Sequence, residues 1–210
     1  MIRKPAHLDR KFDLSGGVLC LDYANTVNRR RSPNRPEDLL PGYSDLMRFA
    51  RQSGLVSPQQ ARGLVATGLQ DCRKAASVMR AADILRETIY RIFSDVASGR
   101  PPQNQDVRKI KGFDDEAMKH RSLVALGRGF QWTWRYTKDN TSLGSVLWPI
   151  VQSATGLMTS ERLQLVRQCQ AGDCAWLFLD ESRNHSRRWC DMKTCGNRQK
   201  ARRHYALKQR

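Results

Sequence analysis

The sequence predicts a mainly α-helical protein of the α+β class: a helix-rich body with a few short strands, followed by a small C-terminal module of a hairpin and a helix. Three observations support this. Apolar residues recur at three- and four-residue steps over residues 75–96, a strong helix start stands at residues 57–60, and four cysteines form two pairs near the C-terminus. We expect the body to occupy residues 1–160 and the module residues 161–210.

The N-terminal third predicts loops and then two short helices. The first 35 residues are expected to be loop and short extended pieces around GGVLCLDYANTV, whose two glycines mark a turn. Residues 44–53 predict a helix that stops at Gly54, because three apolar residues share one face. The next helix begins at Ser57, an N-cap serine followed by a proline at the first helical position and a capping-box glutamine.

The central part of the chain predicts one long amphipathic helix and shorter elements after it. Residues 75–96 are expected to bury one apolar face. Another helix could start within residues 106–111, and the segment LGSVLWPIVQSATGLM predicts a helix broken or kinked at Pro149. In FQWTWRY the aromatic residues alternate, which favours one buried strand face over a base-stacking platform. These aromatic residues are Phe130, Trp132, Trp134 and Tyr136.

The charge of the chain indicates a polyanionic partner. Lys and Arg number 37 against 20 Asp and Glu, which gives a net charge of +17, and hydrophobic residues make up 40% of the sequence. That apolar content argues against a wholly disordered chain, and the excess positive charge makes nucleic acid the first candidate partner. No apolar run resembles a signal sequence or approaches the roughly 18 residues of a membrane span. The expected location is therefore the cytoplasm, at the nucleoid, with no membrane partner.

Four cysteines have the spacing of a metal site. Cys169 and Cys174 form one pair with four intervening residues, and Cys190 and Cys195 form a second pair with the same spacing. Two close thiolate pairs favour one structural zinc ion, which would supply the folding energy that so short a segment cannot obtain from a core. Separate unligated thiols and an iron–sulfur cluster are the alternatives. A closed four-cysteine site leaves no open position for catalysis.

Little in the body predicts catalysis, but one segment could form an effector pocket. No nucleophile, base and orienting group can be assembled from the sequence, which argues against an enzyme. The segment LCLDYANT carries polar residues inside an apolar stretch, with arginines nearby, and could bind a small anion or metabolite. The alternative is that Asp22 and Asn25 cap a turn or satisfy buried backbone groups. The candidate pocket residues are Asp22, Asn25, Thr26 and Arg30.

The C-terminal segment resembles a known family. CQAGDCAWLFLDESRNHSRRWCDMKTCGNRQKARRHY is similar to the CGNR zinc finger, whose name is the string formed here by residues 195–198. The segments LCLDYANTVNRR and RPEDLLPGYSDLMRFARQSGLVS, with the long helix, resemble the ABATE domain that precedes this finger. The resemblance implies a bacterial, stress-linked transcription regulator with a mostly helical body and a zinc-bound DNA-binding module. We expect that module to be treble-clef-like, with WLFLD and RRW in its hairpin.

The last helix is the candidate DNA-binding element. It is expected to begin near Cys190 to Cys195 and to run through GNRQKARRHYALKQ, with charge on all sides, which suits a groove between phosphates. The alternatives are a merely solvated basic helix, a protein-binding module for a transcription partner, and RNA binding. The predicted partners are double-stranded DNA, a small-molecule effector and a second copy of the chain. The candidate DNA-contacting residues are Arg187, Arg188, Arg198, Lys200, Arg202 and Arg203.

Overall fold

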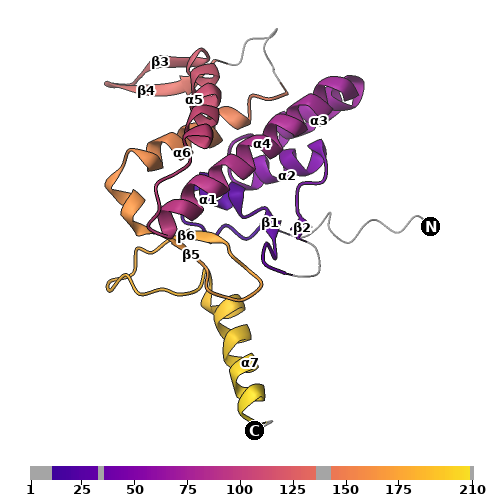
Figure 1. Cartoon of the computed structure of the whole chain (residues 1–210). Helices are drawn as coiled ribbons and strands as arrows, with labels where there is room; N and C mark the ends of the chain where they lie inside the picture. The colour runs from indigo at the N-terminus through magenta and orange to yellow at the C-terminus, as the bar shows by residue number, and fades with distance from the viewer. Residues whose placement is uncertain (1–10, 33–35, 136–142, 209–210) are drawn as a thin grey trace, which may run out of the picture.

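Helices dominate the structure, a computed structural model that describes residues 11–32, 36–135 and 143–208, without the side chains of Arg203 and Leu207. The helix α4 (Cys72–Ala97) crosses the middle of the molecule, and the other helices of the body lie around it (Figure 1). The described strands form three separate two-stranded antiparallel sheets. The predicted class is confirmed: a mostly helical body, with a C-terminal hairpin and helix. No helix in the described ranges is long and apolar enough to cross a membrane.

The N-terminal segment contains a helix that the sequence did not predict. The predicted turn is present, with Gly17 at a φ of 81°, but Leu19–Ala24 forms the helix α1 instead of an extended piece. Four of its six residues are buried, so apolar side chains occupy most of its circumference. The sequence therefore lacks the one-sided apolar periodicity by which a helix is recognised. Beyond it, β1 (Val27–Asn28) pairs with β2 (Glu37–Asp38).

The two following helices confirm the sequence signals. α2 (Tyr43–Gln52) ends just before Gly54, whose φ is 73°. α3 (Pro58–Gln70) begins with the predicted capping box: the Ser57 hydroxyl accepts from the Gln60 amide at 3.2 Å, and the Gln60 side chain accepts from the Ser57 amide at 2.8 Å. Both helices pack against α4.

The long helix α4 is also confirmed, and it joins most parts of the body. Its buried face includes Leu85, Ile89 and Phe93, within a core to which α1, α2, α5 (Asn104–Met118) and α6 (Leu147–Met158) contribute. The buried Arg86 of α4 pairs with Asp38 at 2.7 Å. No break occurs at Pro149, because this proline is the third residue of α6, where no intrahelical partner is available for a backbone N–H.

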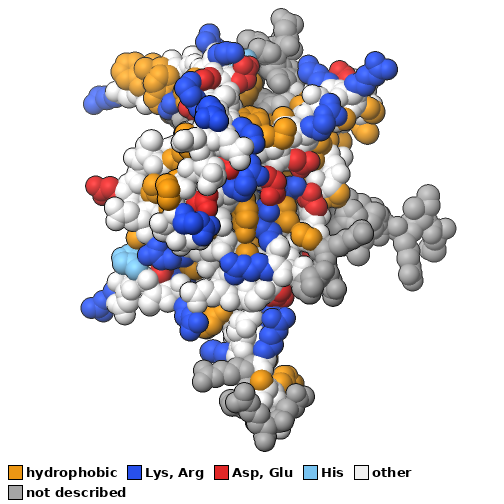
Figure 2. Space-filling view, in the orientation of Figure 1, with side chains coloured by type: hydrophobic (Ala, Val, Ile, Leu, Met, Phe, Trp, Pro, Cys, Tyr) orange, Lys and Arg blue, Asp and Glu red, His pale blue; other side chains and the backbone are white. Residues whose placement is uncertain are grey.

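The aromatic strand is β4 (Gly129–Trp134), but its predicted burial is wrong. Phe130 is 76% exposed and Trp132 is 55% exposed, while Trp134 is half-buried and Tyr136 lies outside the described residues. The strand pairs with β3 (Arg121–Leu126), whose existence the sequence did not predict, in a two-stranded ribbon whose apolar face the described residues leave largely uncovered. Figure 2 shows hydrophobic side chains gathered over this ribbon.

The C-terminal module keeps its predicted parts but changes a hairpin partner. After the 3₁₀ helix η2 (Glu161–Leu165), β5 (Val166–Gln168) pairs with β6 (Leu177–Leu179). The predicted partner RRW is not a strand, because buried Asp180 accepts a hydrogen bond from the Arg187 backbone amide at 2.8 Å and so closes a loop. A π-helical turn, η3 (Met192–Gly196), then leads into α7 (Asn197–Lys208), which projects away from the body (Figure 1).

Candidate metal centre and basic helix

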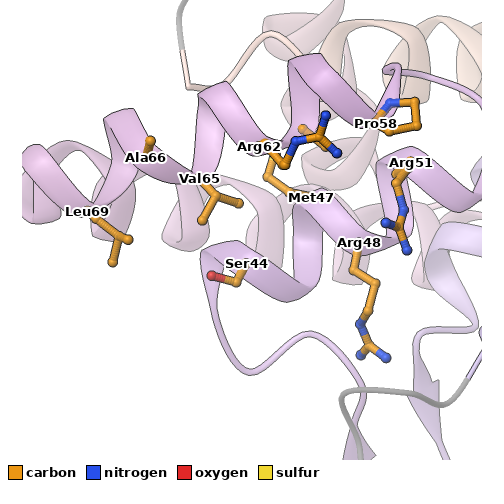
Figure 3. A pocket seen from close by; sticks show the side chains of 10 residues that line it. Ser44, Met47, Arg48, Arg51, Pro58, Arg62, Val65, Ala66 and Leu69 are labelled. Atoms are coloured by element: carbon orange, nitrogen blue, oxygen red, sulfur yellow. The ribbon is translucent and has the colours of Figure 1, made fainter.

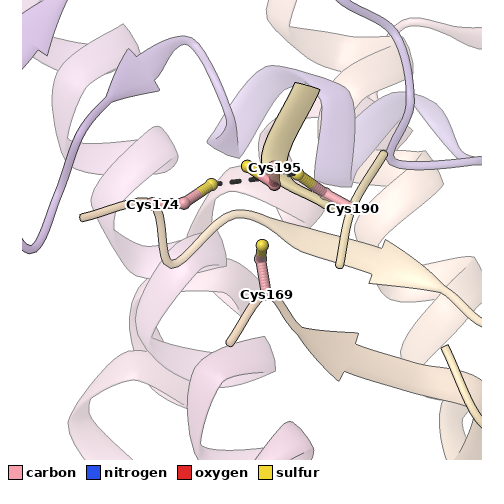
Figure 4. A group of neighbouring side chains, drawn as sticks. All are labelled: Cys169, Cys174, Cys190 and Cys195. Atoms are coloured by element: carbon pink, nitrogen blue, oxygen red, sulfur yellow. Dashed lines mark hydrogen bonds between the residues drawn. The ribbon is translucent and has the colours of Figure 1, made fainter. Parts of the chain in front are cut away.

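The four paired cysteines meet at one point of the C-terminal module. Cys169 follows β5, Cys174 precedes β6, Cys190 closes the loop after β6, and Cys195 lies in η3 (Figure 4). All four are buried free thiols, and their sulfur atoms lie within 4.8 Å of one another. The Cys174 and Cys190 sulfurs are 3.8 Å apart, and the Cys190 and Cys195 sulfurs are 3.7 Å apart.

This spacing fits a tetrahedral zinc ion. Four thiolates at a zinc–sulfur distance of about 2.3 Å stand about 3.8 Å from one another, which is the edge of the tetrahedron. Without a cation the Cys190 thiol resists ionisation: the neighbouring sulfurs, that of Cys169 first, and burial raise its pKa far above the ordinary range. The four buried cysteines thus form a single structural zinc site, as the sequence predicted.

The zinc site has its own small hydrophobic cluster. The four cysteines pack with Ala171, Trp176 and Phe178, and Trp189 packs against them, apart from the main core of the body. Both tryptophans therefore pack around the metal site. This cluster buries little apolar area, so metal ligation contributes much of the stability of the chain around the four sulfurs.

The two cysteines without a predicted partner lie away from the zinc site. Both are expected to pack as small hydrophobic residues. Cys20 is fully buried in α1, which confirms the expectation for this residue. Cys72 is exposed, because it is the first residue of α4 and lies on the open end of that helix.

Two of the candidate DNA-contacting arginines hold the finger together. The guanidinium of Arg187 donates to the Leu179 carbonyl at 3.1 Å and to the Cys190 carbonyl at 2.6 Å. Arg188 donates to the Gln170 side chain at 2.7 Å and its own carbonyl accepts from the Gln170 amide at 2.9 Å. These contacts give both residues a role in positioning the loop that carries Cys190.

The candidates on α7 are arranged around one acidic residue. Asp173, in the loop between the first two cysteines, pairs with Arg198 at 3.2 Å and with Arg202 at 3.4 Å. Arg198 also donates to the Cys195 sulfur at 3.2 Å, and its positive charge there offsets part of the negative charge of a four-thiolate zinc centre. Lys200 is exposed. The side chain of Arg203 lies outside the part of the chain that the structure describes.

The candidate pocket residues make contacts that join the body to the finger or tie the body together. Asn25 is 2% exposed, and its side chain donates to the Leu177 carbonyl at 2.8 Å and accepts from the Leu177 amide at 2.9 Å. Thr26 donates to the Tyr23 carbonyl at 2.7 Å. Arg30 forms a two-point ion pair with Glu87 in α4. Three pockets in the described residues are each lined by other side chains.

Further contacts between residues far apart in sequence fix the finger on the body. The Trp176 indole donates to the Val27 carbonyl at 3.0 Å, and the Leu179 amide donates to the Gly16 carbonyl at 2.9 Å. Tyr90 of α4 donates to the Ala175 carbonyl at 3.3 Å. Residues far apart in sequence thus hold β6, and with it the metal site, in a defined position on α1 and α4. The only sequence signal was the set of polar residues inside an apolar stretch.

Raising the pH is expected to destabilise the protein through Asp22. Burial raises the pKa of this carboxyl to about 7, although the Gly16 amide donates to it at 2.8 Å. Between about pH 4 and 7 the folded chain therefore binds more protons than the unfolded chain, so the free energy of unfolding falls as the pH rises. Asp22→Asn removes the charge and keeps the acceptor, so its stability advantage over the wild type should grow from pH 5 to pH 8.

Urea unfolding of zinc-saturated protein at both pH values measures this difference. Glu161→Gln is the matched control, because Glu161 is an exposed carboxylate in η2. Its difference from the wild type should stay constant with pH. A constant difference for Asp22→Asn as well would contradict the expected protonation of Asp22 in the folded state.

Comparison with protein families gives two matches along the chain. Residues 17–161 match the ABATE family, whose description is "Putative stress-induced transcription regulator". Residues 166–208 match the CGNR zinc finger. No curated protein matches the sequence. The second match contains all four clustered cysteines and α7, and the first contains Asn25, Val27 and Tyr90, which contact the finger.

Proposed function

The chain belongs to the ABATE family of stress-induced transcription regulators and ends in a CGNR zinc finger, and on that premise we propose that it regulates transcription by binding double-stranded DNA through α7. The observation that carries the proposal is the exposed basic helix attached to the zinc centre. In this proposal the body, residues 1–160, holds the finger, residues 161–210, in place, and the protein acts at the nucleoid in the cytoplasm.

The charge of α7 supports a contact with phosphates. Its sequence NRQKARRHYALK contains five lysines and arginines and no acidic residue. The described side chains beyond Gln199 are exposed, so no apolar face commits this helix to a protein core. A major groove of about 12 Å admits one α-helix, with phosphates on both sides of it.

Asp173 supports the proposal by orienting the first turns of the helix. The Arg198 and Arg202 side chains that it pairs with are 38% and 54% exposed, and exposed ion pairs of this kind contribute only about 0–1 kcal/mol. A phosphate can therefore replace the carboxylate at little cost, while the zinc ligands keep the start of the helix in place. We propose that the pairs pre-orient both guanidinium groups toward the DNA backbone.

Neutralising α7 is expected to weaken duplex binding and its dependence on salt. The variant carries Lys200→Gln, Arg202→Gln and Arg203→Gln. Each lost phosphate contact should make the slope of log affinity against log salt less negative by about 0.9. Fluorescence anisotropy with a labelled duplex at several salt concentrations measures both quantities, after random-pool selection has supplied a bound sequence.

The matched control removes the same charge from the body. Arg73→Gln, Lys74→Gln and Arg80→Gln change exposed residues of α4. This control should leave the salt slope unchanged and reduce affinity only slightly. If both triple variants lost affinity equally, net charge rather than α7 would account for binding. If the α7 variant kept full affinity for duplex but no longer captured a transcription partner, the finger would be a protein-binding module.

A further inference from the structure

A groove lies between α2 and α3, on the body and away from the residues assigned to DNA contact. Its volume is about 370 Å³, within the range of about 300–1,000 Å³ typical of small-molecule sites. Met47, Ala61 and Val65 form part of its apolar surface, and Met47 is 1% exposed. At one end Leu69, which is 71% exposed, extends this apolar surface.

The other end of the groove is strongly basic. Arg48 and Arg51 of α2 and Arg62 of α3 line it, and no acidic residue does. Arg48 is oriented by Asp45 at 3.1 Å, on the preceding turn of α2. Among the described residues, no carboxylate pairs with Arg51 or Arg62, and both are exposed. Figure 3 shows the arginines toward the Pro58 end and Val65, Ala66 and Leu69 toward the opposite end.

We propose that this groove binds an amphipathic carboxylate, a small molecule with one anionic head and an aliphatic tail. The exposed Arg51 and Arg62 at one end are available to a carboxylate, which an arginine binds with two parallel hydrogen bonds. The tail then lies along Met47 and Val65 toward Leu69, where each buried methylene raises the affinity about fourfold. A ligand without the anionic head would leave the arginines without an anion. A short acid, which lacks the long tail, would leave the apolar surface exposed to water.

Such a site would give a regulator of this family a ligand to sense. The groove uses α2 and α3, both of which pack on α4, and α4 also contacts β5 and β6 of the finger. The binding site itself does not depend on the proposed DNA contact, because none of its lining residues belongs to the finger or to α7. Ligand binding can therefore be measured on its own, whether or not the chain binds DNA.

The test is a calorimetric titration of the zinc-loaded full chain with decanoate, decanol and butyrate. We expect decanoate to bind with one site per chain, and decanol and butyrate to bind at least about tenfold more weakly, because each lacks the head or most of the tail. Equal binding of decanoate and decanol would overturn the role of the arginines. Equal binding of decanoate and butyrate would overturn the role of the apolar surface.

Two exposed arginines give a matched pair of variants. Arg62→Gln should weaken decanoate binding about tenfold to a hundredfold, as expected for the loss of a charged hydrogen-bonding partner. Arg108→Gln removes the same charge from α5, where Arg108 is exposed outside the groove, and should leave binding unchanged. Equal losses in both variants would mean that decanoate responds only to net charge and would overturn the site. Both changes are on the surface, and thermal melting checks that each variant is folded.

Discussion

Cys190→Ser is expected to abolish stoichiometric zinc binding and to unfold the C-terminal module. The Cys190 sulfur contacts two other sulfurs of the cluster, at 3.8 and 3.7 Å, so its loss opens the tetrahedron. Structural zinc sites contribute apparent binding free energies of about 10–16 kcal/mol, far more than this small cluster of apolar residues can replace. The zinc content measured by elemental analysis should therefore fall from one ion per chain to a small fraction of that, and duplex binding should be lost as well.

Cys72→Ser is the control for this experiment. Cys72 is an exposed thiol at the start of α4, so the variant should keep one zinc per chain and wild-type stability. The body should also retain its helical circular dichroism in the Cys190→Ser variant, because the main hydrophobic core contains none of the four zinc ligands. A Cys190→Ser protein with one tightly held zinc and unchanged affinity for duplex would contradict the assignment of this ligand.

Asn25→Ala is expected to destabilise the protein by about 2–6 kcal/mol. The Asn25 side chain bonds both the amide and the carbonyl of Leu177, and both residues are buried. Alanine leaves these two backbone groups without partners, and a buried unsatisfied group costs about 1–3 kcal/mol. Chemical unfolding of the zinc-saturated protein gives the free energy difference directly.

Asn104→Ala is the control, since Asn104 is an exposed residue at the start of α5. A change of no more than about 0.5 kcal/mol is expected there. Because Asn25 belongs to the body and Leu177 to the finger, Asn25→Ala should also increase protease cleavage between β5 and β6. An Asn25→Ala protein as stable as the Asn104→Ala protein would show that the two hydrogen bonds to Leu177 are replaced by water.

The parts of the fold that were predicted correctly are those whose signals are local. The capping box at Ser57, the periodic face of α4 and the cysteine spacing each lie within one segment of sequence. The errors concern tertiary partners. α1 is buried on most sides and so shows no period, and β6 pairs with β5 because Asp180 folds RRW into a loop. Exposed Phe130 and Trp132 were misread because alternation indicates a strand but not whether a second layer covers it.

The segment LCLDYANT shows the same limit at the level of the site. A polar side chain within an apolar stretch can serve a pocket or satisfy a buried backbone group, and the two uses look alike in sequence. The partner of Asn25 is 152 residues away, so no local pattern could identify it. The zinc ligands could be predicted from sequence, because tetrahedral coordination by two cysteine pairs imposes a spacing that is recognisable without knowledge of the fold.

The projecting helix α7 has a consequence for how the protein would bind and leave DNA. None of its described side chains belongs to either hydrophobic cluster, and an isolated helix of about 12 residues is only marginally stable in water. The helix carries five lysines and arginines and no acidic residue, so repulsion between like charges destabilises it further when it is free. Beyond the turns held by Asp173, amide protons should exchange rapidly in the free chain and slowly on duplex. On the proposed DNA contact, ordering these last turns would offset part of the binding energy and so favour fast dissociation from the duplex.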